Sequence, residues 1–239
     1  MTLFHGANIV TNGLVLFLDA ANPRSYSSTA TGVWKDLSGR GNSGTLTNTP
    51  IYSPNNAGYL WFNQDLTFVS PQLFYVNNAS ADFNYGTGDF AVELWLYPIY
   101  PLQTQYVPTI YTNHGDGDWN TTGTGMRLQY GEVLANSQAP IFTYTPALQL
   151  LAWQQHVVTR VGTTMSAYIN GLLVGSVSGA SFVVGDSTDR PALATSDGIP
   201  TGREWFGGYM SICRVYKGQG LTSNLVIQNF NAHRGRYGI

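Results

Sequence analysis

The chain has 239 residues, of which 43% are hydrophobic, 13% aromatic and 10% charged. This length and apolar content fit one domain over residues 1–239 with a sizeable core, and the aromatic content argues against disorder. The formal net charge of −2 excludes the basic surface that nucleic-acid-binding proteins usually carry.

The first part of the chain predicts short strands separated by turns. Residues 13–20 form an apolar segment that we expect to be a buried strand, and residues 59–62 form another. Between them, residues 36–44 are rich in Asp, Ser, Asn and Gly, which favour turns.

The clearest strand covers residues 89–97, where apolar residues alternate strictly with others. We expect one face to lie in the core and the other, with a carboxylate between large rings, to be half exposed. The core face consists of Phe90, Val92, Leu94 and Leu96, and the other face of Ala91, Glu93, Trp95 and Tyr97.

Further strands are predicted along the rest of the chain, and each is bounded by turn residues. The pair Asn170-Gly171 is typical of a type I′ hairpin turn between two of them. The segments are residues 109–112, 125–133, 141–144, 156–161, 165–169, 172–178 and 209–216.

One helix is predicted at residues 223–233, with Thr222 as its N-cap and Gly235 as the left-handed residue after its end. We expect one stripe of this helix to be buried, made of Val226, Ile227 and Phe230. The spacing of the strands gives roughly 10–14 in one domain. The fold class is therefore all-β, an antiparallel two-sheet sandwich with one short C-terminal helix, of unknown strand order.

The single cysteine, Cys213, excludes an internal disulfide and a cysteine-based metal cluster, and we expect it to be a small buried residue. The chain shows no signal peptide, and its longest apolar run, residues 14–18, is too short to span a bilayer. We expect a protein made in a cytoplasm, without membrane insertion.

Five segments in order resemble a concanavalin A-like jelly-roll of the laminin-G-like type: residues 13–26, 33–48, 88–98, 153–175 and 206–238. The opening LDAANP and the closing RGRYG are similar to a variant found in structural proteins of tailed bacteriophages. The resemblance implies a jelly-roll sandwich that serves as a binding or decoration module on a virion. We recognise no such resemblance in residues 99–150.

Enzymes of this fold are retaining glucanases, which need two carboxyl groups about 5–5.5 Å apart. Glu93 has no second carboxylate beside it on its strand, because Trp95 and Tyr97 follow on the same face. His156 shows no spacing that pairs it with a nucleophile. We expect no enzymatic activity and a hydrogen-bonded or solvated Glu93.

A polar loop offers candidate calcium ligands in Asn113, Asp116 and Asp118, because oxygen ligands on a flexible loop suit Ca²⁺. Calcium is the only cofactor that we consider. The alternative is that these polar residues form a solvated loop tip without a metal. A second loop could supply ligands equally well from Asp186, Asp189 and Asp197.

The same first loop is a candidate glycan site. Trp119 could form an aromatic platform beside the polar groups of Asp118 and Asn120, with Tyr111 as a further ring.

The expected function is a non-enzymatic structural or decoration protein of a phage virion, on the capsid, a head fibre or the tail. Its partners would be other virion proteins, further copies of the chain and a cell-surface glycan. The low charge, with Lys35 and Lys217 as the only lysines, fits a surface in lasting contact with other subunits or sugars. The alternatives are a carbohydrate-binding lectin module and a degenerate glycoside hydrolase.

Overall fold

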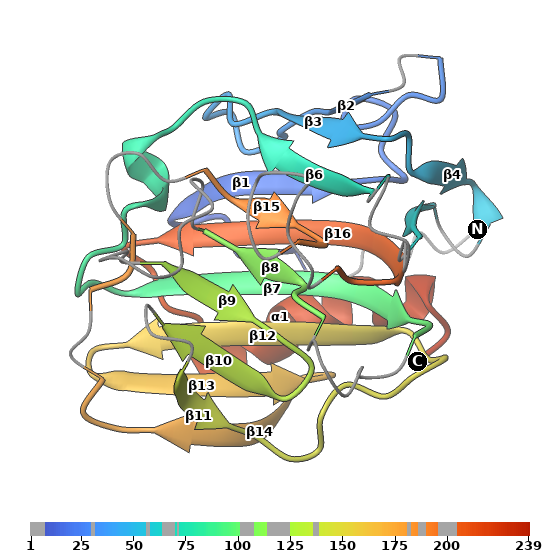
Figure 1. Ribbon diagram of the computed structural model, residues 1–239. Coiled ribbons are helices and arrows are strands. Elements are labelled where there is room, and N and C mark those ends of the chain that lie inside the picture. Colours follow the sequence, from blue (N-terminus) through green and yellow to red (C-terminus); the bar gives the residue numbers. More distant parts are fainter. Residues whose placement is uncertain are drawn as a thin grey trace.

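The computed structural model describes residues 8–29, 32–55, 58–63, 70, 72–100, 108–113, 125–135, 139–180, 183–185, 190–195 and 205–239. In these residues the chain forms two antiparallel sheets packed face to face and a single α-helix near the C-terminus (Figure 1). The expected all-β sandwich with one short C-terminal helix is confirmed.

Sheet I is the sheet whose outer face carries the helix. Its strands are β1 (Leu14–Asp19), β4 (Ile51–Ser53), β5 (Tyr59–Phe62), β7 (Phe90–Pro98), β12 (Gln154–Val161), β13 (Thr164–Ile169), β14 (Leu172–Val177) and β16 (Gly208–Lys217). They run in the order β14-β13-β12-β7-β16-β5-β4, and β1 also pairs with β16. Strands β1 and β16, which come from the two ends of the chain, are therefore neighbours in this sheet.

Sheet II lies in front of sheet I in Figure 1, and α1 (Ser223–His233) lies behind sheet I. The strands of sheet II are β2 (Val33–Trp34), β3 (Gly44–Thr47), β6 (Leu73–Val76), β8 (Tyr111–Thr112), β9 (Met126–Leu128), β10 (Glu132–Ala135), β11 (Ala139–Thr143) and β15 (Ala192–Leu193). They run in the order β11-β10-β9-β8-β15-β6-β3-β2. Two 3₁₀ helices, η2 (Ala81–Phe83) and η3 (Arg234–Arg236), complete the described elements.

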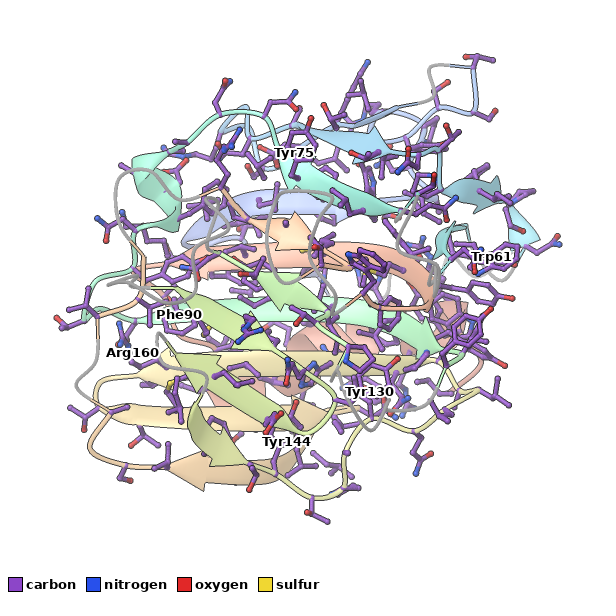
Figure 2. The ribbon with its side chains drawn as sticks, in the orientation of Figure 1. Trp61, Tyr75, Phe90, Tyr130, Tyr144 and Arg160 are labelled. Carbon is purple, nitrogen blue, oxygen red and sulfur yellow. The ribbon has the colours of Figure 1, made fainter. Side chains whose placement is uncertain are left out.

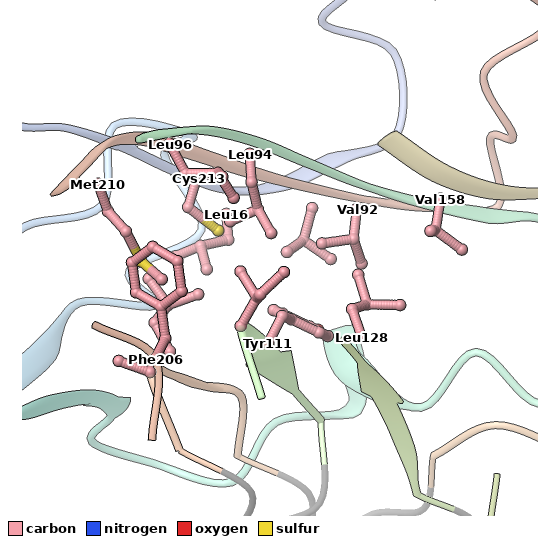
Figure 3. Close-up of a cluster of buried hydrophobic side chains, with 14 of the residues drawn as sticks. Leu16, Val92, Leu94, Leu96, Tyr111, Leu128, Val158, Phe206, Met210 and Cys213 are labelled. Atoms are coloured by element: carbon pink, nitrogen blue, oxygen red, sulfur yellow. The ribbon is translucent and has the colours of Figure 1, made fainter. Parts of the chain in front are cut away.

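The core lies between the sheets, where the apolar face of β7 is fully buried as expected. Figure 3 shows Val92 and Leu94 of this strand facing Tyr111 and Leu128 of sheet II. Cys213 belongs to the same cluster, and burial raises the pKa of its thiol well above the ordinary value. The cysteine is therefore a protonated core residue, as the sequence predicts.

The other face of β7 is more buried than expected. Ala91, Glu93 and Trp95 are fully buried, and only Tyr97 on this face is half exposed. The reason is that α1 packs here, with the ring of Phe230 stacked on Trp95 at a centroid distance of 5.8 Å. Because α1, which is distant from β7 in sequence, covers this outer face of sheet I, the side chains between them form a second buried layer.

The helix itself has the predicted bounds but a different buried stripe. Val226 is buried, whereas Ile227 is 42% exposed and the buried position one turn on is taken by Asn229. The prediction of Gly235 as a left-handed end residue is wrong, because the chain continues as η3 and the left-handed glycine is Gly238. No helix in the described part of the chain is long and apolar enough to cross a membrane.

Several strands differ from the sequence prediction. Residues 125–133 form the antiparallel pair β9 and β10 rather than one strand. Strands β2, β3, β4, β6 and β15 were not predicted, because alternation over two to four residues does not identify a strand. The hairpin turn is confirmed, since Asn170 and Gly171 both have positive φ, 52° and 80°.

The turn over residues 36–44 is held by one carboxylate. Asp36 accepts hydrogen bonds from the backbone nitrogens of Phe17, Ser38 and Asn42 at 2.8–3.0 Å, and from the Ser38 hydroxyl at 2.7 Å. This motif therefore fastens the loop to β1 and is structural.

Candidate functional site

Most of the site residues predicted from sequence cannot be placed. Asp116, Asp118, Trp119 and Asn120 lie outside the described residues, as do Asp186, Asp189 and Asp197. Their roles in calcium or sugar binding stay predictions. Within the described part of the chain, no group of three or more His, Cys, Asp or Glu side chains could hold a metal ion.

The two predicted residues that are described lie inside the sandwich. Tyr111 is fully buried in the core, and its hydroxyl is 2.7 Å from the Tyr85 hydroxyl, so the expectation that it contacts a sugar is wrong. Asn113 is also fully buried, and its Oδ1 accepts a 2.6 Å hydrogen bond from the Met126 backbone nitrogen. This contact joins the segment after β8 to β9, and it argues against Asn113 as a calcium ligand.

Glu93, the carboxylate considered for hydrolysis, is fully buried beneath α1. Its Oε1 accepts hydrogen bonds from Arg214 Nη1 at 3.0 Å, Gln155 Nε2 at 3.0 Å and Trp95 Nε1 at 3.2 Å. Its Oε2 accepts one from Asn229 Nδ2 at 2.6 Å. No substrate can reach Glu93 in this structure, and its contacts fasten the helix to the sheet.

The outer face of sheet I carries exposed rings beyond the end of the helix. We call Tyr59, Trp61, Tyr97, Trp153 and Tyr209 the aromatic strip. Trp61 pairs with Tyr209 across β5 and β16, and Tyr209 pairs with Tyr97 across β16 and β7. Directly paired residues point to the same face, so the three rings form a row across adjacent strands about 4.8 Å apart. Figure 2 shows Trp61 at the right-hand end of the sandwich.

Four rings of the strip, all but Trp61, are in contact with one another in the described structure. Tyr209 stacks on Tyr59 at a centroid distance of 4.2 Å and on Tyr97 at 5.2 Å, and Tyr97 meets Trp153 edge-on at 5.7 Å. Trp153 is 8% exposed, whereas the other four rings are half-buried. The row is extended at the sheet edge by Ile51, which pairs with Trp61 and is 55% exposed.

A buried layer supports the strip from the helix side. Trp153 packs on Tyr237 at a centroid distance of 4.8 Å, and Tyr237 stacks on Trp95 at 4.4 Å. Trp95 is fully buried and Tyr237 is 9% exposed. Because these rings are fixed by packing, the exposed rings above them are held in place before any ligand arrives.

The strip is uncharged and carries hydroxyl groups. Burial raises the pKa of Tyr209, and the neighbouring phenols of Tyr59 and Tyr97 raise it further. The Tyr209 hydroxyl is therefore protonated at neutral pH and can donate or accept a hydrogen bond. The surface combines apolar ring faces with polar edges, which suits a ligand that is itself amphipathic.

The sequence pointed to only part of this surface. The alternation in residues 89–97 placed Trp95 and Tyr97 on one face. The row requires β16 to lie between β7 and β5, however, and these three strands are far apart in the sequence. Strand order could not be predicted, so the strip could not be found.

Solved structures with a similar fold include domain 4 of AbnA, a GH43 extracellular arabinanase from Geobacillus stearothermophilus, in complex with arabinotriose. The TM-score is 0.66 at 16% identity, over 95% of this chain and 100% of that one. Trypanosoma rangeli sialidase matches with a TM-score of 0.64 and 18% identity, over 98% of this chain and 35% of that one.

The binding domain of Paraclostridial Mosquitocidal Protein 1 matches with a TM-score of 0.64 and 14% identity, over 93% of this chain and 53% of that one. The chain thus spans about half the length of this domain and about a third of the sialidase. Identities this low show a shared fold. No curated protein sequence matches the chain.

The sequence also matches a family model, that of the concanavalin A-like lectin/glucanases superfamily. The match covers residues 74–223, which is more than half of the chain and runs from β6 to the start of α1. Together with the two-sheet sandwich, this match is sufficient to assign the family. The chain belongs to the concanavalin A-like lectin/glucanases superfamily.

Proposed function

We propose that the protein is a glycan-binding, lectin-like module without catalytic activity, and that the aromatic strip is its sugar-contacting surface. The observation that carries the proposal is the row of half-exposed rings formed by Trp61, Tyr209 and Tyr97 across three adjacent strands. Sugar rings have an apolar C–H face that stacks on aromatic rings and hydroxyls that hydrogen-bond at the edge.

Two further observations support this proposal. The rings are fixed by the layer beneath them, so little side-chain entropy is lost when a ligand binds. The arabinanase domain with the same fold was solved with arabinotriose, which shows that such a sandwich can hold a sugar chain. The buried Glu93, without a second carboxylate on its strand face, supports a binding role rather than hydrolysis.

Trp61→Ala is expected to raise the dissociation constant for a bound glycan about tenfold, because it removes one of the three ring faces of the row. The ligand would first be found on an array of arabino-oligosaccharides and bacterial surface polysaccharides. Affinity for the best ligand would then be measured by isothermal titration calorimetry.

Tyr75→Ala is the matched control for this experiment. Tyr75 is a half-buried ring on the outer face of sheet II, away from the strip (Figure 2). Its removal is expected to leave glycan affinity unchanged. An equal loss of affinity in both variants, or no bound glycan at all, would refute the sugar-binding role of the strip.

We also propose a setting for this module: a decoration or tail-associated component of a tailed-phage particle, present in several copies. This proposal is supported by the similarity of the opening and closing segments to phage structural proteins and by the low charge of the chain. Mass spectrometry of density-purified particles, with quantitation against the major capsid protein, tests it. Absence of the chain from the particles would refute the setting and leave the glycan proposal standing.

A further inference from the structure

A hollow lies at the opposite end of sheet I from the aromatic strip. It has a volume of about 490 Å³ and lies between the turn before β1 and the end of β16. Lys217 at this end pairs with Phe90, which Figure 2 shows on the left, whereas Trp61 lies on the right. Lys217 follows Tyr209 by eight positions in β16, a distance of about 25 Å. The hollow is therefore a separate site.

The hollow is bounded by backbone and by apolar side chains. Gly13 and Gly218 both line it with positive φ, 71° and 69°. A Cβ at Gly13 would lie 2.5 Å from the Gln219 Cβ, so this close backbone approach requires glycine. The half-buried Leu14 supplies apolar surface. The shape of the hollow therefore depends on glycine at position 13.

Two cations and one carboxylate line the same hollow. Arg40 donates to Asp82 from Nε at 3.2 Å and from Nη2 at 2.6 Å, and Lys217 Nζ donates to the Ala81 carbonyl oxygen. The hydrogen bonds from Arg40 hold the pKa of Asp82 below its ordinary value, so this carboxyl group is ionised at neutral pH. The three groups together carry one net positive charge.

Hydrogen-bond donors remain available on both cations. In the described part of the chain, Arg40 uses Nε and Nη2 and makes no hydrogen bond from Nη1, and the side chain of Arg40 is 56% exposed. Lys217 has one acceptor, which leaves two of its three N–H groups for a ligand. The other lysine of the chain, Lys35, is not part of this hollow.

We propose that this hollow binds a sugar with a single negative charge, as in a uronic acid or a sugar sulfate ester. The anionic group would accept hydrogen bonds from Arg40 Nη1 and Lys217 Nζ and neutralise the net charge. The C–H surface of the sugar would lie against Leu14. The inference rests on the proposed function only in taking the anion to be carried by a sugar.

The test is titration of the protein with methyl glucuronide, glucose 6-sulfate and neutral methyl glucoside, followed by two-dimensional NMR. Binding of either charged sugar is expected, with shifts confined to the lining segments 11–15 and 217–218 and to Arg40 and Asp82. The two probes tell carboxylate from sulfate. The neutral sugar is expected to bind at least about tenfold more weakly. Equal binding of the neutral sugar, or no binding of any probe, would overturn the proposal.

Two variants are expected to change the affinity in opposite directions. Lys217→Met removes a cation and should weaken binding about fivefold, whereas Asp82→Asn removes the competing carboxylate at nearly constant shape and should strengthen it by a similar factor. Lys35→Met, at the exposed lysine, is the control and should have no effect. Weaker binding in Asp82→Asn, or equal effects of the two lysine variants, would refute the charge-based site.

The outcome is independent of the aromatic strip. Trp61→Ala is expected to bind the charged monosaccharides like the unmodified protein, because its ring lies at the other end of sheet I. If the strip fails to bind any glycan while the hollow binds methyl glucuronide, only the proposed role of the strip is lost.

Discussion

Glu93→Gln is expected to lower the free energy of unfolding by about 3–5 kcal/mol, the cost of leaving the partner of a buried ion pair uncompensated. The Glu93 carboxylate and the Arg214 guanidinium are 3.0 Å apart, and both side chains are 0% exposed. Removing the negative charge leaves the guanidinium buried beneath α1. Because a domain is stable by only about 5–15 kcal/mol, the loss should be plain in urea denaturation followed by tryptophan fluorescence.

Two further variants define this effect. Asp89→Asn is the matched control, since Asp89 is a half-buried carboxylate just before the same strand and should cost less than about 1 kcal/mol. Adding Arg214→Met to Glu93→Gln should recover part of the stability, because the unpaired charge is removed. If the free energy of unfolding of Glu93→Gln is within about 1 kcal/mol of that of the unmodified protein, the buried pair does not hold the helix on the sheet.

The protein is expected to lose about 3 kcal/mol of stability from His156 alone as the pH falls from about 6.5 to about 4. Burial lowers the pKa of His156 to about 4 in the folded protein. An unfolded histidine titrates near 6.5, so the unfolded state takes up the proton first as the pH falls. The stability is complete above pH 6.5 and declines below it. Urea denaturation at a series of pH values measures the decline.

The surroundings of His156 explain why its pKa is lowered. The Tyr144 hydroxyl donates to the Gln129 carbonyl oxygen at 3.0 Å, so its oxygen accepts the hydrogen bond from His156 Nε2 at 2.7 Å. In the described part of the chain Nδ1 has no partner, so a second proton would be buried without an acceptor. Burial and the nearby Arg214 and Arg236 also lower the pKa of His233, to about 3, which adds to the acid lability.

His156→Gln separates the two histidines. The variant should be less stable at pH 7, but its stability should fall less steeply between pH 6.5 and 4 than that of the unmodified protein. The variant Tyr144→Phe keeps His156, and its stability should therefore still fall steeply between pH 6.5 and 4. If His156→Gln shows the same pH dependence as the unmodified protein, His156 is not the group that titrates.

The buried contacts of Glu93 also bear on function. Asn229 on α1 binds Glu93, donates to the Tyr216 hydroxyl at 3.0 Å and accepts from the Val10 backbone nitrogen at 2.8 Å. These bonds fix the helix, and the chain after it supplies Tyr237 beneath the strip. The carboxylate considered for hydrolysis thus helps to hold the layer beneath the aromatic strip in place.

Local patterns in the sequence were sufficient for much of the fold. The alternation in β7 identified the core face from Phe90 to Leu96, and Asn170-Gly171 identified a hairpin because its residues accept positive φ. The helix bounds were also predicted correctly, although Gly235 does not end the helix as expected. Each of these features depends on neighbours within a few positions, which is the range over which side-chain period and turn preference act.

The amino-acid sequence by itself therefore determined the all-β class, the core face of the central strand and the helix. Only the tertiary structure decided that Trp61, Tyr209 and Tyr97 form one row and that Glu93 lies beneath α1. Alternation tells which residues of a strand share a face, but it does not tell which strands are neighbours or what covers that face. Those choices depend on the packing of segments far apart in the chain, and they created both the exposed strip and the buried ion pair.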